Sequence, residues 1–389
     1  MQRQSLIGVV LQMQSKLDPR RILQEVLSIP SINGSDGELI LCRYLESLFN
    51  QFGITNQIVM TSPKRANLIA SIEGTAPESS IVLNGHLDTV PYGNLDDWNT
   101  PPDMPIIQDG HIFCRGASDM KSGLAAMASA MCWLSENKIK PQSSLYFLAT
   151  CDEERNGEGA LWARKQEFMR NASFLLIAEP TDNRIALAEK GCIWLKLVFK
   201  GKASHSAYPE EGASAFEYGC HFISRLQDFL LAGGSDEFLG QSTMVVTQSF
   251  AGIADNMVPD KAEFHLDIRT LPKMQFDSII DEINELVSWL HAKEPQIEVS
   301  YEVVNKRVAL KTAKDNQRIQ DFLSCVPGVK EFIGINYYTD ASLLNEDNRI
   351  PFLIFGPGYL NQMHKSNESC NLKYYDFAYH VYRTFLNKC

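Results

Sequence analysis

Histidine, aspartate and glutamate residues stand at the ends of short apolar runs, or just before a helix, at several places in the chain. In chain order they are His86, Asp88, Asp119, Glu153, Glu154, Glu179 and His364. Because functional groups collect beyond the carboxyl ends of the strands in an open α/β sheet, we expect these side chains to share one edge. Imidazole and carboxylate groups in such a cluster are the ligands that Zn²⁺ and related ions use for hydrolysis.

The number of these residues indicates a pair of metal ions. Two ions that share a carboxylate need about five ligating side chains, and a catalytic base makes about six. Five residues are the candidate ligands: His86, Asp119, Glu154, Glu179 and His364. Glu153 or Asp88 then remains for acid–base chemistry or for support of a ligand. Residues i and i+2 of an extended segment point the same way, so Asp88 can orient the imidazole of His86.

Buried strands are predicted where apolar residues run on without alternation, at 81–83, 145–149, 174–178 and 352–355. Such runs are typical of strands covered on both faces by helices. Apolar residues at spacings of three and four predict amphipathic helices over about 36–52 and 121–134. The pattern indicates an α/β domain with a mixed sheet flanked by helices.

A different pattern begins near residue 185. Strict alternation over 262–268 and 297–303 predicts strands with one buried face, and apolar stripes predict helices over 213–231 and 276–290. The order indicates an α+β ferredoxin-like unit with helices on one face of an antiparallel sheet. Because the buried-strand pattern returns at residue 352, we expect this unit to be inserted. The predicted domains are 1–183 with 305–389, and 184–304.

The composition narrows the class of protein. A formal net charge of −11 over 389 residues argues against nucleic-acid and anionic-membrane partners. No run approaches the ~20 apolar residues of a transmembrane helix, and the short apolar run at 6–11 lacks a cleavage site behind it. Nine cysteines without CxxC spacing are typical of reduced thiols, so we expect a cytoplasmic protein.

Six sequence motifs resemble those of the zinc aminoacylase/carboxypeptidase family of metallopeptidases. This family includes acetylornithine deacetylase, succinyl-diaminopimelate desuccinylase, carboxypeptidase G and bacterial di- and tripeptidases. The motifs are GHLDTVP from Gly85, RGASDMKSG from Arg115, DEE from Asp152, EPT from Glu179, HSA from His205 and HKSNE from His364. Together they extend the resemblance from about residue 20 to the end of the chain.

The resemblance implies a two-zinc hydrolase. Asp119 would bridge the ions, His86 and Glu179 would complete one site, and Glu154 and His364 would complete the other. Glu153 would be the general base, and Asp88 would orient His86.

The inserted unit resembles the family's lid and dimerisation domain, which implies a homodimer. His205 would reach the partner subunit's active site and stabilise an oxyanion. Arg269 and Asn256 resemble lid residues that contact substrate, and a guanidinium pairs well with a carboxylate. Gly358 would shape the pocket on the catalytic side.

Three functions are compatible with these residues. The first is hydrolysis of the amide bond of a small N-acyl amino acid, as in a deacetylase or desuccinylase. The second is exopeptidase activity on di- or tripeptides or a chain terminus, with residues 337–340 as possible lining of the pocket. The third is a catalytically silent scaffold, which the presence of every ligand and of the base disfavours. Zinc, cobalt and manganese all suit the ligands.

Overall fold

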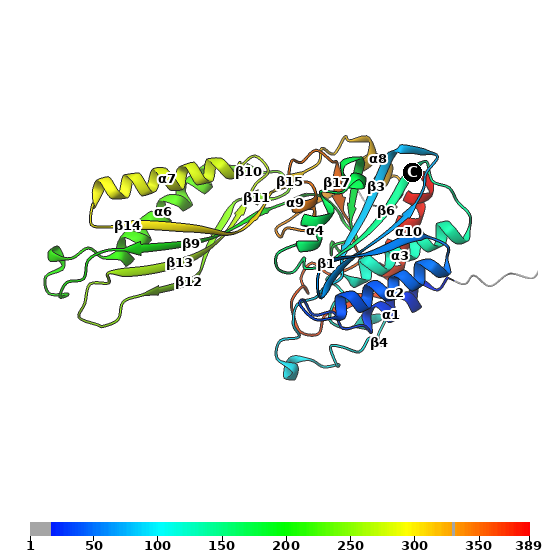
Figure 1. Ribbon diagram of the computed structural model, residues 1–389, viewed down its shortest axis with the longest axis horizontal. Coiled ribbons are helices and arrows are strands. Elements are labelled where there is room, and N and C mark those ends of the chain that lie inside the picture. The colour runs from blue at the N-terminus through cyan, green and yellow to red at the C-terminus, as the bar shows by residue number, and fades with distance from the viewer. Residues whose placement is uncertain (1–16, 329–330) are drawn as a thin grey trace, which may run out of the picture.

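A large sheet and a smaller sheet lie along the length of the molecule, as Figure 1 shows. The computed structural model describes residues 17–328 and 331–389, so the apolar run at 6–11 lies outside the described residues. The chain passes from the large sheet to the smaller one at Lys190 and returns at residues 308–309. The smaller sheet is therefore inserted between strands of the larger one.

The large sheet carries the predicted buried strands. Its strands are β1 (Thr55–Ser62), β2 (Arg65–Ile72), β3 (Ala76–His86), β6 (Ser143–Thr150), β7 (Ala172–Ile177), β8 (Ile185–Glu189), β15 (Leu310–Lys311), β16 (Phe332–Ile335) and β17 (Phe352–Ile354). Their order is β1-β2-β6-β3-β7-β17-β8-β15, with β16 paired to β8. The central strands β6, β3, β7 and β17 are parallel, whereas β2 on β6 and β8 on β17 are antiparallel. The predicted mixed sheet is confirmed.

Helices cover both faces of this sheet, which explains why its central strands show no alternation. Ile81 and Leu83 of β3 face one core, and Val82 faces the other. The first core includes residues of α1 (Pro19–Leu27), α2 (Gly37–Gln51), α3 (Lys121–Glu136), α8 (Gln317–Leu323) and α10 (Leu372–Lys388). The second core includes residues of α4 (Glu158–Ala163), α5 (Glu167–Arg170) and α9 (Ala341–Leu344).

The smaller sheet and its helices form the lid. Its elements are β9 (Gly191–Lys200), α6 (Ala215–Ala232), β12 (Thr243–Ala251), β13 (Lys261–Thr270), α7 (Phe276–Lys293) and β14 (Glu298–Arg307). The strands are antiparallel in the order β12-β13-β9-β14, which is the ferredoxin-like order. Both helices pack on one face of the sheet, because Ala262, Phe264, Leu266 and Ile268 of β13 all turn toward them. The predicted fold class is confirmed.

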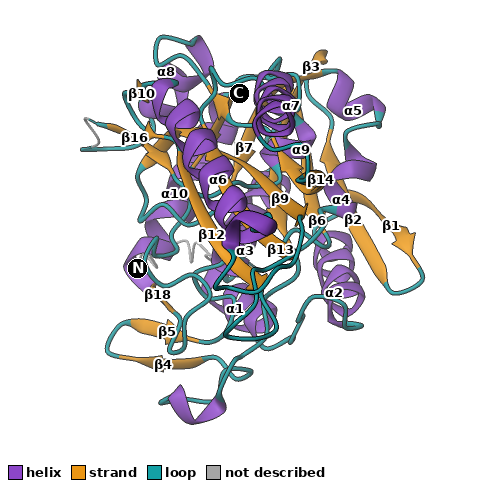
Figure 2. Ribbon diagram, turned by 90° about the vertical axis from the view of Figure 1, so that its left-hand side faces the viewer, coloured by secondary structure: helices purple, strands orange, loops and turns teal. Residues whose placement is uncertain are grey.

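Short strands complete the structure. β4 (Ile106–Gln108), β5 (His111–Phe113) and β18 (Ser369–Asn371) form a small sheet, visible below the large one in Figure 2. β10 (Ser235–Asp236) pairs with β11 (Gly240–Gln241) beside the junction of the lid. Among the helices of the described residues, none is long and apolar enough to cross a bilayer.

Candidate metal centre

The candidate ligands come from five separate segments that meet at one edge of the large sheet. His86 is the last residue of β3, Glu154 lies in the turn after β6, and Glu179 follows β7. Asp119 lies in the loop before α3, and His364 lies between β17 and β18. The structure therefore brings together residues that are nearly 280 positions apart, as the strand-end argument predicts.

The ligand atoms form two groups that share Asp119. One group is His86, Asp119 and Glu179, the other is Asp119, Glu154 and His364, and within each the ligand atoms lie within 4.8 Å of one another. His86 Nε2 lies 3.0 Å from Asp119 Oδ1 and 3.5 Å from Glu179 Oε1. His364 Nε2 lies 2.9 Å from Glu154 Oε2 and 3.4 Å from Asp119 Oδ2. The two oxygens of Asp119 thus face different groups, which suits a bridging carboxylate.

The electrostatics of the cluster favour bound cations. Burial lowers the pKa of His86, but the carboxylates of Glu179 and Asp119 outweigh it and raise that pKa well above its usual value. Hydrogen bonds to Asp119 and Glu154 raise the pKa of His364 to about 10. Burial raises the pKa of Glu179 well above its usual value. Protons must therefore balance this buried negative charge when no cation does.

Glu154 adds a second reason why the residues fit divalent ions. Its Oε1 is buried and has no hydrogen-bond partner among the residues described. A buried carboxylate oxygen without a donor is costly unless a cation meets it. Oxygen and imidazole nitrogen donors of this kind suit zinc and its neighbours in the first transition series.

Asp88 holds the turn that carries Glu153 and Glu154. Its Oδ1 accepts a hydrogen bond from the backbone N–H of Glu153 at 3.1 Å, and its Oδ2 accepts one from that of Glu154 at 3.1 Å. His86 Nδ1 lies 2.8 Å from the backbone oxygen of Asp88 and 3.8 Å from its carboxylate. Asp88 thus supports both the imidazole and the turn.

A network behind Asp88 was not predicted from the sequence. Asn33 donates from Nδ2 to Asp88 at 2.7 Å and to Asp152 at 3.0 Å, and its own Oδ1 accepts from Arg65 at 2.8 Å. Arg65 also pairs with Asp152 at 2.7 Å. These partners come from segments far apart in the chain, with Arg65 at the start of β2, and carry no local signal. Their pairing depends on the tertiary fold.

Glu368 holds the loop that presents Asp119. Its buried carboxylate accepts backbone hydrogen bonds from Gly116, Ser118 and Asp119, and it pairs with Arg115 at 2.6 Å. The sequence contained a signal for this residue, because Glu368 closes the motif that begins at His364. Its partners are set by the tertiary fold, because the loop from Arg115 to Asp119 folds over its carboxylate.

Glu153 lies beside the ligands without belonging to either group. Burial and the charge of Glu179 raise its pKa well above the usual value, whereas the charge of His86 lowers it. Its backbone is fixed by Asp88, as described above. A carboxyl group with a raised pKa in this place can hold a proton that it takes from a nearby water molecule.

The lid residues singled out in the sequence lie at opposite ends of the lid. His205 and Asn256 are exposed at the end far from the metal centre, where His205 bridges to the residue after Asn256. β9 runs for ten residues from the junction toward that end, which is about 30 Å at ~3.3 Å per residue. Arg269 lies at the other end of the lid, near the junction. His205 therefore cannot reach the metal centre of its own chain in this arrangement.

Gly358 packs against the loop that carries Asp119. A Cβ atom at this position would lie 2.1 Å from the backbone oxygen of Ser118. Only glycine permits this approach, so Gly358 shapes the metal centre through its backbone.

An α/β domain with a mixed sheet, two candidate ligand groups that share one carboxylate, and an inserted lid together define a class of metal-dependent hydrolases. A model of Peptidase family M20/M25/M40 matches residues 82–388 of the chain. The chain belongs to this family of metallopeptidases. The resemblance seen in the sequence motifs is thereby confirmed.

Relatives in this family include proteins with desuccinylase names. A Staphylococcus epidermidis protein named Probable succinyl-diaminopimelate desuccinylase is 30% identical over 409 residues, covering 96% of this chain and 99% of its own. A Staphylococcus aureus protein of the same name is 27% identical, covering 92% of this chain and 95% of its own.

Solved structures with the same fold carry peptidase names. Aminopeptidase PepT from Bacillus cereus aligns with a TM-score of 0.76 at 20% identity, over 95% of this chain and 98% of its own. A Bacillus subtilis protein described as a dinuclear metal binding peptidase from M20 family aligns with a TM-score of 0.71 at 14% identity, over 95% and 96%. At these identities the likeness shows the fold.

Proposed function

We propose that the protein hydrolyses the amide bond of a small N-acyl amino acid, as a deacetylase or desuccinylase does. One observation carries the proposal: the two ligand groups share Asp119 and lie beside a buried carboxyl group, Glu153, that belongs to neither. We propose two divalent ions, zinc with cobalt or manganese as alternatives, held as His86–Asp119–Glu179 and Asp119–Glu154–His364.

The residues of the chain would divide the chemistry among them. When bound, divalent ions supply Lewis acidity, which polarises a carbonyl and lowers the pKa of water toward 7. Glu153 takes a proton from the attacking water and returns it to the departing amine, so one residue serves as base and then as acid. The carboxylate of Asp88 holds Glu153 in place by accepting a hydrogen bond from the backbone N–H of Glu153. His205 of a second copy would donate to the oxygen that gains charge in the transition state.

The relatives and the structural neighbours favour different substrates. The desuccinylase names of the relatives that cover almost the whole chain favour an acylated amino acid. The peptidase names of the structural neighbours favour the alternative, a di- or tripeptidase or carboxypeptidase-type exopeptidase. Both substrates present a small amide with a carboxylate close by, and both suit the same metal centre.

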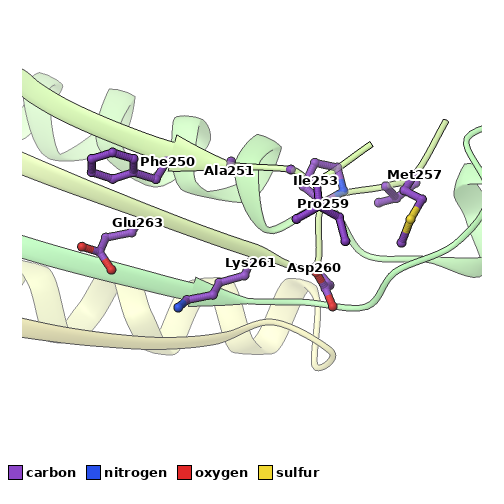
Figure 3. Close-up of a pocket in the computed structure, with 10 residues that line it drawn as sticks. Phe250, Ala251, Ile253, Met257, Pro259, Asp260, Lys261 and Glu263 are labelled. Carbon is purple, nitrogen blue, oxygen red and sulfur yellow. The ribbon is translucent and has the colours of Figure 1, made fainter. Parts of the chain in front are cut away.

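We propose a homodimer formed through the lid. The limits of the lid, 184 and 304, stay a prediction, and β8 lies in the large sheet. β12 is the edge strand of the lid sheet and exposes Val245 and Phe250, whose exposed fractions are 57% and 59%. A second copy can pair with such an edge. A hollow of about 340 Å³ lies at the far end of this strand, and its lining includes Phe250, Ile253 and Met257. Figure 3 shows these three side chains spread along it.

We also propose a cytoplasmic location. All nine cysteines lie in the described part of the chain, and all are free thiols. Reduced thiols suit a reducing compartment.

Replacement of Glu153 by alanine tests the proposed chemistry. We expect Glu153→Ala to bind metal normally and to lose about 10³-fold in kcat on the best substrate of a panel of N-acetyl amino acids, N-succinyl amino acids and dipeptides. Metal analysis of the dialysed protein and amine release measure the two effects. Glu154→Ala is the matched control, because it removes a ligand and should lower metal content. Turnover of Glu153→Ala near the wild-type rate would show that the role assigned to Glu153 is wrong.

A further inference from the structure

One arginine lies at the centre of the network behind the turn that carries Glu153. Arg65 begins β2, and its side chain is largely buried. Its Nη1 lies 2.7 Å from Asp152 Oδ1, its Nη2 donates to Asn33 Oδ1 at 2.8 Å, and its Nε lies 3.6 Å from Glu38 Oε2. Asp152 and Glu38 are fully buried, and among the described residues no other cationic side chain forms an ion pair with either of them.

Asp152 has a backbone conformation that is unfavourable for a residue with a side chain. Its φ is 65°, in the left-handed region that residues with a Cβ atom seldom occupy. Such a conformation persists only where the surrounding contacts hold it. Asp152 is the residue before Glu153, so its backbone angles set the direction in which the Glu153 side chain points. The proposed base is therefore aimed by a residue that must be held in place.

Contacts hold Asp152 at its side chain and at its backbone. Its Oδ1 accepts a hydrogen bond from Asn33 at 3.0 Å, in addition to the ion pair with Arg65. Its backbone N–H donates to Glu38 at 2.9 Å, and its backbone oxygen accepts from the N–H of Gly157 at 2.6 Å. Arg65 contacts both of the acceptor and donor side chains that bind Asp152. One guanidinium thus orders the support of the side chain and of the backbone together.

A second route leads from Arg65 to the turn through Asn33. Because Arg65 donates to Asn33 Oδ1, the Nδ2 group of this amide must face the opposite way, where it donates to Asp88 at 2.7 Å. Asp88 in turn accepts the hydrogen bond from the backbone N–H of Glu153 at 3.1 Å. The rigid fork of a guanidinium fixes the orientation of the groups that it binds. Arg65 therefore orients Asn33 toward the residue that holds the base.

We infer that Arg65 is a positioning residue for Glu153. It holds Asp152 in the left-handed conformation and orients the amide of Asn33, and both actions fix the turn that carries the base. Among the described residues Arg65 forms no hydrogen bond or ion pair with Glu153 or with a candidate ligand, so it acts through the turn. This inference rests on the proposed function, because that function makes Glu153 the base.

Replacement of Arg65 by glutamine tests the inference with the best substrate of the panel described above. We expect Arg65→Gln to lower kcat about 10- to 100-fold, because the base is no longer held in line with the attacking water. KM should change by less than about threefold, because the residues that Arg65 contacts lie behind the turn. Competitive metal titration sets the ion concentration at which wild type and variant are both saturated.

The same change in a chain without the base separates positioning from general damage. In Glu153→Ala no base remains to be aimed, so addition of Arg65→Gln should lower the residual kcat by less than about twofold. Damage to the metal centre or to substrate binding would lower kcat equally with and without Glu153.

A crystal structure of Arg65→Gln gives a readout that does not depend on activity. We expect the φ of Asp152 to become negative, because the left-handed conformation has lost part of its support. A φ that stays near the wild-type value would overturn the inference.

Two further variants keep the test independent of folding. Arg65→Lys retains the positive charge between Asp152 and Glu38 but loses the fork. We expect it to fold and to lose about 3- to 10-fold in kcat, again only where Glu153 is present. Arg20→Gln is the matched control, because Arg20 of α1 also pairs with a carboxylate, that of Asp376 on α10 at 2.5 Å. It should leave kcat and KM unchanged.

The outcomes separate the inference from the proposed function. An unchanged kcat in Arg65→Gln, a change confined to KM, or equal losses with and without Glu153 would overturn the inference and leave the hydrolase proposal standing. Failure of the metal-loaded wild type to release amine from every substrate of the panel would overturn both.

Discussion

Glu189 is an acid buried without a charged partner at the end of β8. Its residue is fully buried, its Oε2 accepts a hydrogen bond from Thr339 at 2.7 Å, and its Oε1 has no partner among the described residues. Burial raises its pKa well above the usual value, although the Thr339 hydrogen bond lowers it. The folded protein therefore holds a proton here that the unfolded chain releases near pH 4.5.

This proton makes the stability depend on pH with a definite sign. Because the folded-state pKa is raised, Glu189 destabilises the fold progressively as pH rises above about 4.5, by up to about 1.4 kcal/mol per pH unit. Urea unfolding at several pH values measures the free energy of unfolding of wild type and Glu189→Gln. We expect wild type to lose stability relative to Glu189→Gln as pH rises from 5 to 8. Glu285→Gln, a change on the exposed side of α7, should track wild type, and a parallel course for Glu189→Gln would contradict the prediction.

The sequence predicts single residues well where a strand end positions them. His86, Glu154 and Glu179 follow buried strands, so their meeting place follows from the sheet alone. Glu368 does not follow a strand, and its partners Arg115, Gly116 and Asp119 lie 249 to 253 residues away in the chain. Its role depends on tertiary contacts that a pattern in one segment does not contain.

The first turn of α3 shows how an element positions a ligand. Gly123 lies in this turn, and a Cβ atom there would lie 2.0 Å from the backbone oxygen of Ala178 at the end of β7. Asp119 precedes α3 and Glu179 follows Ala178, so the contact sets the separation of two ligands. The sequence predicts both elements within a few residues but not this contact, because glycine has many other uses.

A methyl group at Gly123 should therefore disturb the metal centre. We expect Gly123→Ala to lower the free energy of unfolding by about 1–3 kcal/mol and to weaken metal binding, because backbone atoms must move apart. Gly219→Ala is the control, since the new Cβ on α6 of the lid would lie 2.4 Å from Phe264. It should reduce stability but not metal affinity, both measured by denaturation and competitive metal titration. Equal metal affinity in the two variants would refute the coupling between α3 and β7.

At the scale of the whole molecule, His205 lies too far from the metal centre of the same chain to act there. The strands of the lid carry this residue away from the junction, and the exposed edge of β12 offers a surface for a second copy. The sequence predicts the inserted unit and the order of its strands and helices along the chain. It does not show the distance between His205 and the ligands, which depends on how the two sheets are joined.

Mixing two inactive variants tests whether His205 acts across subunits. Each variant alone, His205→Ala or Glu153→Ala, should be nearly inactive. If subunits exchange at random, half of the dimers are mixed and one of their two sites is intact, so activity should return to about a quarter of wild type. Glu153→Ala mixed with Glu154→Ala is the control and should stay inactive, because both residues belong to one centre. A mixture no more active than its components would contradict the arrangement.

The narrow joint at Lys190 and residues 308–309 makes the two ends of the lid mechanically unequal. A rotation of about 10° there would carry His205 and Asn256, some 30 Å out, through about 5 Å. Arg269 and Arg307 would barely move, because they lie next to the pivot. The residues next to the joint are thus held still while the residues at the far end travel. A change in the length of the lid strands would alter the path of His205 and leave the surroundings of the metal centre as they are.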